Sequence, residues 1–241
     1  MRFVIALIVA VAAASPASAD GLFGKAKNLL GNVTGSKSSG GLTDSEIGSG
    51  LREALRIGSA RVVDQVSAPG GFETDSLIHI PLPDNLQKAQ RMLGRLGMSN
   101  QLDELEVRLN RAAEQASVKA KDLFVDAIAA MTMDDVRNIL SGPDDAATQF
   151  FRRQMSPGLT AEMRPVVDRT LSEVGAIQTY EETVGEFSRV PLIPDLRTDL
   201  TNHVLQLGLD GIFHYLAVEE AAIRNNPAKR TTELLQKVFS N

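Results

Sequence analysis

The stretch from Asp199 to Arg224 constrains the fold most, because its apolar residues cover nearly the whole circumference of a helix. They fall on two stripes about a quarter-turn apart: Leu205, Leu209, Ile212, Leu216 and Ile223 on the first, and Val204, Leu207, Gly208, Gly211, Tyr215, Val218 and Ala222 on the second. A helix that is apolar nearly all round is buried inside a bundle. We therefore expect a buried central helix near residues 199–224.

Helical stripes and helix-start signals dominate the chain that precedes this stretch. Thr43 with Glu46 three residues later has the pattern of a capping box, and Thr132 with Asp135 marks another helix start. No segment has the pattern of a sheet strand. We therefore expect one all-α domain over residues 42–241, a helical bundle of about eight to ten helices.

Several helix boundaries follow from local signals. The apolar stripe from Leu102 to Met131 is expected to break near Ser117, which can cap a new helix. One helix is expected to begin at Asp144 and a separate one to follow over about Thr160 to Val174. Further helices are expected over residues 176–187 and from Pro227 onward, because proline suits the first position of a helix.

The segment over residues 72–84 differs from its surroundings. Its apolar residues alternate, and two prolines remove backbone donors: Ile78, Ile80, Leu82, Pro81 and Pro83. This pattern predicts an extended arm packed on helices and not a sheet strand. Asp84, with Gln87 completing a capping box, is expected to cap a helix over residues 85–97.

Residues 1–19 have the pattern of a secretory signal peptide, with Arg2 at the start, an apolar run, and small residues before Asp20. We expect cleavage after Ala19 and export of a soluble chain, because the apolar run is too short to span a membrane comfortably. Residues 20–41 are expected to form an amphipathic leader and a Gly/Ser linker. Within the leader, residues 21–33 have an apolar face flanked by lysines, which suits weak membrane-surface or partner contact, or else is a marginal helix without such a role.

The composition excludes several functions. The formal net charge is -5, which argues against nucleic-acid binding because that needs a concentrated positive surface. The chain has no cysteine, which excludes disulfides, lipoprotein attachment, thiolate metal ligands and cysteine nucleophiles. No phosphate-binding loop or hydrolase motif is present, and no cofactor is expected.

Five ordered phrases carry a resemblance to a known family: IPLPDNLQKA at residues 80–89, LNRAAEQA at 109–116, LFVDAI at 123–128, DDAATQFFRRQMS at 144–156, and LDGIFHYLAVEE followed by IRNNPAKRTTELLQKVF near the end. Together they resemble the exported bacterial family known as domain of unknown function (DUF) 4197. The resemblance covers nearly the whole chain after the linker. It implies a helical periplasmic protein of Gram-negative bacteria, and it brings no reaction, ligand or catalytic residue.

Two of the three histidines lie in the expected central helix. His203, Asp210 and His214 are separated by nearly whole numbers of helical turns and therefore share one side. His203 and His214 are roughly 16 Å apart along the axis, too far to share one metal ion unaided, and we assign no metal site. One hypothesis uses either histidine as a general base with Asp210 orienting the ring; the alternative is that each is hydrogen-bonded to a neighbouring helix or carboxylate.

Arg152 and Arg153, together with Arg111, are candidate ligands of a carboxylate or phosphate, because the planar guanidinium binds such groups at two points. The alternative is a set of internal salt bridges that join helices. We favour the salt bridges, because adjacent residues such as Arg152 and Arg153 point to different sides of a helix.

Two carboxylate doublets, Glu219 with Glu220 and Glu181 with Glu182, are unsuited to acid–base catalysis. Neighbouring side chains diverge by about 100 degrees on a helix, so neither doublet forms a catalytic pair by itself. We place both doublets on solvated faces.

The sequence therefore favours a non-enzymatic periplasmic binding or interaction protein that takes a partner protein, or an apolar or anionic ligand, between its helices. One alternative is a periplasmic hydrolase-like enzyme that uses the His/Asp pair. A further alternative is a membrane-surface-associated structural protein that uses residues 21–33.

Overall fold

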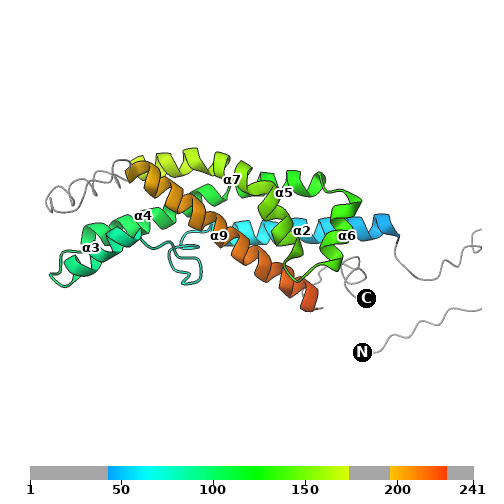
Figure 1. The fold of residues 1–241 in the computed structure, drawn as a ribbon, viewed down its shortest axis with the longest axis horizontal. Coiled ribbons are helices and arrows are strands. Elements are labelled where there is room, and N and C mark those ends of the chain that lie inside the picture. Colours follow the sequence, from blue (N-terminus) through cyan, green and yellow to red (C-terminus); the bar gives the residue numbers. More distant parts are fainter. Residues whose placement is uncertain (1–42, 174–195, 227–241) are drawn as a thin grey trace, which may run out of the picture. The chain divides into compact units, whose positions relative to one another are not determined.

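The computed structural model describes residues 43–173 and 196–226, which are mainly helical (Figure 1). These ranges contain seven helices: α2 Asp44–Val66, α3 Asp84–Gly94, α4 Asn100–Ser117, α5 Ala120–Ala129, α6 Met133–Ser141, α7 Ala146–Glu173 and α9 Leu196–Asn225. No strand occurs in the described ranges, and the all-α class is confirmed. The seven helices of these ranges are fewer than the number expected for the whole domain.

The chain divides into two units, Met1–Gly41 and Leu42–Asn241. The expected signal peptide, leader and linker lie outside the described residues, as do the helices expected over residues 176–187 and from Pro227 onward. Within residues 43–173 and 196–226, every helix is too short or too polar to cross a bilayer.

Capping boxes start α2 and α6, as their sequences predict. Thr43 Oγ1 accepts a hydrogen bond from Glu46 N at 3.2 Å, and the Glu46 carboxylate accepts from Thr43 N at 2.9 Å. At α6, Thr132 Oγ1 accepts from Asp135 N at 3.1 Å, and the Asp135 carboxylate accepts from Thr132 N at 2.9 Å. Each box satisfies N–H groups that the first helical turn leaves without partners.

Residues 67–83, which we call the arm, join α2 to α3 without a strand. Four apolar side chains of the arm are buried, Phe72, Ile78, Ile80 and Leu82, whereas Leu77 is exposed. The side-chain amide of Asn110 on α4 bonds to the backbone of the arm as a neighbouring strand would. Its Oδ1 accepts from Ile80 N at 2.8 Å and its Nδ2 donates to Ile80 O at 2.9 Å. The arm packs on helices without forming a strand, as predicted, but turns occupy residues 72–73 and 76–78, so it is less extended than its alternating pattern predicts.

The start of α3 differs from the prediction. Pro83 is the N-cap residue, no side chain caps the helix, and Asp84 is already its first residue. Gln87 Nε2 donates instead to Leu82 O of the arm at 2.8 Å. The capping-box prediction was wrong because the buried end of the arm, and not a local side chain, determines where the helix begins.

The long apolar stripe of residues 102–131 is split as predicted. α4 ends at Ser117 and α5 begins at Ala120. Ser117 is not the cap of α5, however, because its Oγ donates to Ala113 O in the last turn of α4 at 2.7 Å. The break therefore exists without a side-chain cap on the second helix.

α7 is one continuous helix where two were predicted, and both Pro157 and Pro165 lie inside it. A proline in a helix interior costs about 3 kcal/mol. Buried residues spaced one turn apart continue past both prolines: Met155, Leu159, Met163 and Val167. Because α7 packs along this face against α4 and α9, we attribute its continuity to tertiary packing that outweighs the local cost.

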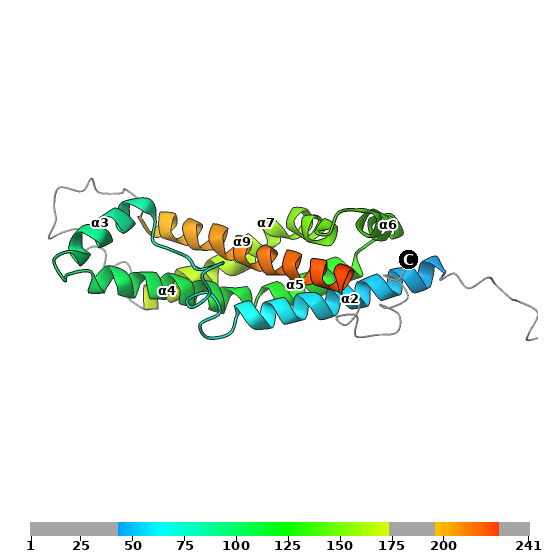
Figure 2. The same cartoon turned by 90° about the horizontal axis from the view of Figure 1, so that it is seen from below.

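α9 packs against α7, α2 and α4, as the two views show (Figure 1) (Figure 2). Its buried apolar side chains include five from the predicted stripes, Val204, Leu205, Ile212, Leu216 and Ile223, and two that the stripes did not contain, Leu200 and Phe213. Leu207, Leu209, Tyr215 and Ala222 of the stripes are only partly buried. One side is nevertheless exposed, at Asn202, Gln206, His214 and Val218. The helix is therefore less completely covered than its composition predicts.

Gly211 allows the arm to approach α9 closely. A Cβ at Gly211 would lie 2.7 Å from Phe72 Cε1 and 3.2 Å from Ile78 Cβ, so it would overlap a buried ring. A Cβ at Gly208, one turn earlier, would make only ordinary contacts of 3.6 Å or more. Gly211 is therefore required by packing, and Gly208 is not.

Candidate functional site

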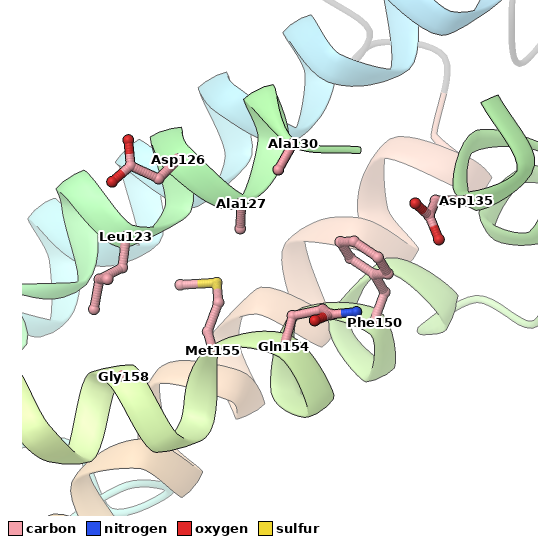
Figure 3. A pocket seen from close by; sticks show the side chains of 9 residues that line it. All are labelled: Leu123, Asp126, Ala127, Ala130, Asp135, Phe150, Gln154, Met155 and Gly158. Carbon is pink, nitrogen blue, oxygen red and sulfur yellow. The ribbon is translucent and has the colours of Figure 1, made fainter. Parts of the chain in front are cut away.

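A groove of about 370 Å³ lies between α5 and α7, with α6 at one end (Figure 3). Its lining residues are Leu123, Asp126, Ala127, Ala130, Asp135, Phe150, Gln154, Met155 and Gly158. This volume falls within the range of roughly 300–1,000 Å³ that is typical of small-molecule sites.

The groove exists because small residues face each other across the α5–α7 contact. A Cβ at Gly158 would meet only Leu123 Cδ2, at 3.8 Å, so there is free space above this position. Ala127 lines the opposite wall. The rings of Phe124 and Phe151 meet edge to face with centroids 5.2 Å apart and hold the same two helices together.

The floor of the groove is apolar. Figure 3 shows Leu123 and Ala127 on α5 facing Met155 on α7, with the ring of Phe150 projecting into the space between the helices. Phe150 and Met155 are both buried. Asp135 of α6 lies at the same end of the groove as Phe150 (Figure 3).

Two carboxylates and no basic side chain line the groove. Hydrogen bonds from Thr132 Oγ1 at 2.7 Å and Thr132 N at 2.9 Å hold the pKa of Asp135 below its ordinary value. Asp126 lies at the outer edge of α5 and is exposed, and among the described residues its carboxylate has no ion-pair partner. The groove therefore combines an apolar floor with negative charge at its rim.

This arrangement is suited to binding more than to catalysis. The lining holds no histidine, lysine, serine or tyrosine that could act as a general base or nucleophile. A carboxylic acid that donates a proton near neutral pH needs a raised pKa, whereas the pKa of Asp135 is lowered. In the part of the chain that the structure describes, no three His, Cys, Asp or Glu side chains are grouped so as to hold a metal ion.

None of the histidine and aspartate candidates of α9 lines this groove. The ring of His203 contacts the arm through Nε2, which lies 2.8 Å from Pro81 O. Asp210 accepts from Arg152 Nη1 at 2.7 Å, whereas His214 is exposed and contacts Tyr215 edge to face. Asp210 and His214 lie one turn apart on α9, but the described hydrogen bonds join Asp210 to the arginine.

The structure places the candidate arginines in separate clusters. Arg152, which pairs with Asp210, lies over the Phe213 ring with its guanidinium carbon 4.7 Å from the ring centroid. Arg111 pairs with Glu114 at 2.9 Å and with Glu73 at 3.1 Å.

Arg153 is exposed beside Arg152 on α7. An anion site at these arginines stays a prediction. An anion binding at Arg111 or Arg152 would compete with carboxylates of the chain itself.

Glu220 is buried, and its predicted place on a solvated face was wrong. Its carboxylate accepts from Ala147 N at 2.9 Å, from Thr148 N at 2.8 Å and from Arg224 Nη2 at 2.8 Å. The first turn of α7 presents unpaired N–H groups and the positive end of the helix dipole, so this carboxylate caps α7 from α9. Glu219 pairs with Arg61 nearer the surface, and the second doublet, at residues 181 and 182, lies outside the described residues.

Comparison with known families identifies the chain. The sequence profile of DUF4197, described as a protein of unknown function, matches residues 41–240. The chain belongs to the DUF4197 family. No curated protein and no solved structure matches it. The family carries no stated activity, so the function of this DUF4197 protein has to be argued from its site.

Sequence reasoning missed the groove of this DUF4197 chain because its residues form no chemical motif. The sequence instead predicted a break before Thr160, between the helix that begins at Asp144 and the next one, and Gly158 lies at that expected break. With α7 continuous, Gly158 falls one turn after Gln154 and on the wall that faces Ala127. The groove depends on that register, which local sequence does not specify.

Proposed function

We propose that this DUF4197 protein is an exported, non-enzymatic binding protein whose α5–α7 groove takes a ligand with an apolar body and a positive charge. The observation that carries the proposal is a groove with an apolar floor whose only charged lining residues are Asp126 and Asp135. This ligand differs in charge from the anionic one that the arginines favour. Arg111 and Arg152 already pair with carboxylates of the chain.

Two features support the proposed export of the protein and the fixed position of one groove wall. The signal-peptide pattern of residues 1–19 and the family resemblance support export to the periplasm. The packing of α9 against α2, α4 and α7 supports a helical bundle around a central helix, which holds α7 and thereby one wall of the groove in place.

Apolar contact supplies most of the affinity in this proposal, and charge supplies the selectivity. Burial of apolar surface contributes about 25 cal/mol for each Å² removed from water. An exposed carboxylate such as Asp126 adds less than about 1 kcal/mol to the binding of a cation, or up to about fivefold in affinity. We expect apolar cations to bind best, neutral analogues less well and anions least.

Calorimetric titration with three ligands that share one tail tests this order: octyltrimethylammonium, octyl glucoside and octyl sulfate, each below its critical micelle concentration. Asp126→Asn should reduce the preference for the cation. Asp122→Asn, which removes an exposed carboxylate of the same helix outside the groove lining, should leave the preference unchanged.

Gly158→Leu should abolish binding of all three ligands, because it fills the groove from the wall of α7. The variant should still fold, since a Cβ at this position meets only one atom at ordinary contact distance. Equal affinity for the cation and the anion, or full binding by the Gly158→Leu protein, would refute the proposal.

A further inference from the structure

Three large apolar side chains are exposed together where α3 ends and turns toward α4. Met92, Leu96 and Met98 have exposed fractions of 69%, 71% and 54%. The turn is hydrogen-bonded, since Met98 N donates to Leu93 O at 3.0 Å, and Gly97 supplies its left-handed φ of 71°. A defined backbone therefore presents these three side chains to solvent, and we call them the α3 tip.

Basic residues cover the solvent face of the same helix. Lys88, Arg91 and Arg95 are all exposed, and their spacing places them on one side of the helix. The opposite side buries Leu86 and Leu93. α3 and the turn after it, residues 84–98, contain these three basic residues and one acidic one, Asp84 at the start of the helix, although the net charge of the whole chain is -5. Positive charge is thus concentrated beside the α3 tip.

The acidic residues at the start of α4 are bonded to other groups. Asp103 accepts from Gln90 Nε2 and from Ser99 Oγ, both at 2.8 Å. Glu104 pairs with Arg108 on its own helix. The described contact of the Arg91 guanidinium is with the neutral Gln87 amide, at 3.2 Å. Asp103 keeps its charge, because both of its donors are neutral, and Asp84 adds an exposed carboxylate in the first turn of α3. Within the described residues, none of Lys88, Arg91 and Arg95 forms an ion pair, so the C-terminal part of α3 beside the tip keeps its positive charge.

We infer that the α3 tip docks on an anionic phospholipid surface. Apolar side chains flanked by cations suit the boundary between lipid headgroups and acyl chains, where both kinds of group are satisfied. A second copy of this chain is a poorer occupant, because pairing two α3 tips would bring two sets of cations together. The surface is separate from the α5–α7 groove and does not involve residues 21–33.

Co-sedimentation with vesicles tests the inference on the full chain. The vesicles contain equal amounts of phosphatidylglycerol and phosphatidylcholine, and phosphatidylcholine alone serves as the neutral surface. We expect binding to the anionic vesicles that weakens as salt is added. The triple variant Lys88→Gln, Arg91→Gln, Arg95→Gln should bind roughly a hundredfold more weakly, at about fivefold for each cation.

A second variant removes the apolar contribution by Met92→Gln, Leu96→Gln and Met98→Gln, and it too should lose most of the binding. Matched controls change exposed residues elsewhere: Lys119→Gln with Lys121→Gln for charge, and Val118→Gln with Val218→Gln for apolar surface. Both controls should bind as the parent does. Because every changed side chain is exposed, unfolding midpoints should stay close to that of the parent.

Several outcomes would overturn the inference. Equal binding to neutral and anionic vesicles would remove the role of the cations. Unchanged binding by both α3 variants would place the lipid contact elsewhere, including residues 21–33. Self-association of the parent chain that the α3 variants abolish, without vesicle binding, would assign the surface to a second copy, and failure of the parent to bind any vesicle would exclude a lipid surface.

Discussion

Replacing Glu220 by alanine should destabilise the fold far more than replacing its neighbour Glu219. Both residues are glutamates in the interior of α9, so the change in helix propensity is the same. Glu220 is 7% exposed and accepts hydrogen bonds from two backbone N–H groups of α7 and from Arg224. Glu219 pairs with Arg61 at 3.0 Å, and the side chain of Arg61 is 46% exposed and that of Glu219 17%.

The magnitudes follow from burial. Breaking a buried ion pair costs about 3–5 kcal/mol, and a buried N–H left without an acceptor costs about 1–3 kcal/mol. These effects overlap at Glu220, so we expect Glu220→Ala to lower the free energy of unfolding by about 4 kcal/mol. The Glu219 pair is open to solvent on its arginine side and caps no backbone group in the described contacts, so we expect Glu219→Ala to cost about 1 kcal/mol, the upper end for a surface pair.

Urea denaturation followed by circular dichroism measures both variants. With a denaturant dependence of about 2 kcal/mol per molar urea, Glu220→Ala should lower the midpoint by about 2 M and Glu219→Ala by about 0.5 M. If the two variants differ by less than about 1 kcal/mol, the carboxylate of Glu220 does not cap α7 in the way described.

Two further predictions concern packing and pH. Gly211→Ala should lower the free energy of unfolding by about 1–3 kcal/mol because the new methyl overlaps Phe72. Gly208→Ala should be neutral or stabilise by up to about 1 kcal/mol. Thermal unfolding of the two variants checks this prediction, and equal midpoints would contradict it. The pKa of Asp135 is lowered in the folded state, so its contribution to stability is present above its ordinary value of 3.8 and is lost as the pH falls below it. Asp135→Asn should therefore reduce the loss of stability between about pH 6 and pH 2, measured by urea titration at both values, and an unchanged pH dependence would contradict the assignment.

The sequence predicts those parts of the fold that depend on local chemistry. The helix starts at Thr43 and Thr132 need only a hydroxyl and a carboxylate three residues apart, and both occur as expected. The arm is likewise predicted by its prolines, although Asn110, which holds its backbone, could not be identified from sequence. Asn110 and Ile80 are 30 positions apart, and local sequence does not predict a contact between residues so far from each other in the chain.

The errors arise where tertiary contacts outweigh local preference. α7 continues through Pro157 because buried residues on both sides of it pack on other helices. Glu220 is buried because it meets the first turn of α7, a contact that α9 alone does not specify. The groove was missed for the same reason, since Gly158 faces Ala127 only when α7 is one helix.

Methionine methyl NMR is the most direct test of the α5–α7 groove as the binding site. Titration with octyltrimethylammonium should shift the methyl signal of Met155, which lines the groove. The signals of Met92 and Met98, which are exposed at the α3 tip, should stay in place. If Met155 is unaffected while Met92 and Met98 shift, the apolar cation binds at the α3 tip, and the groove is not the ligand site of this protein.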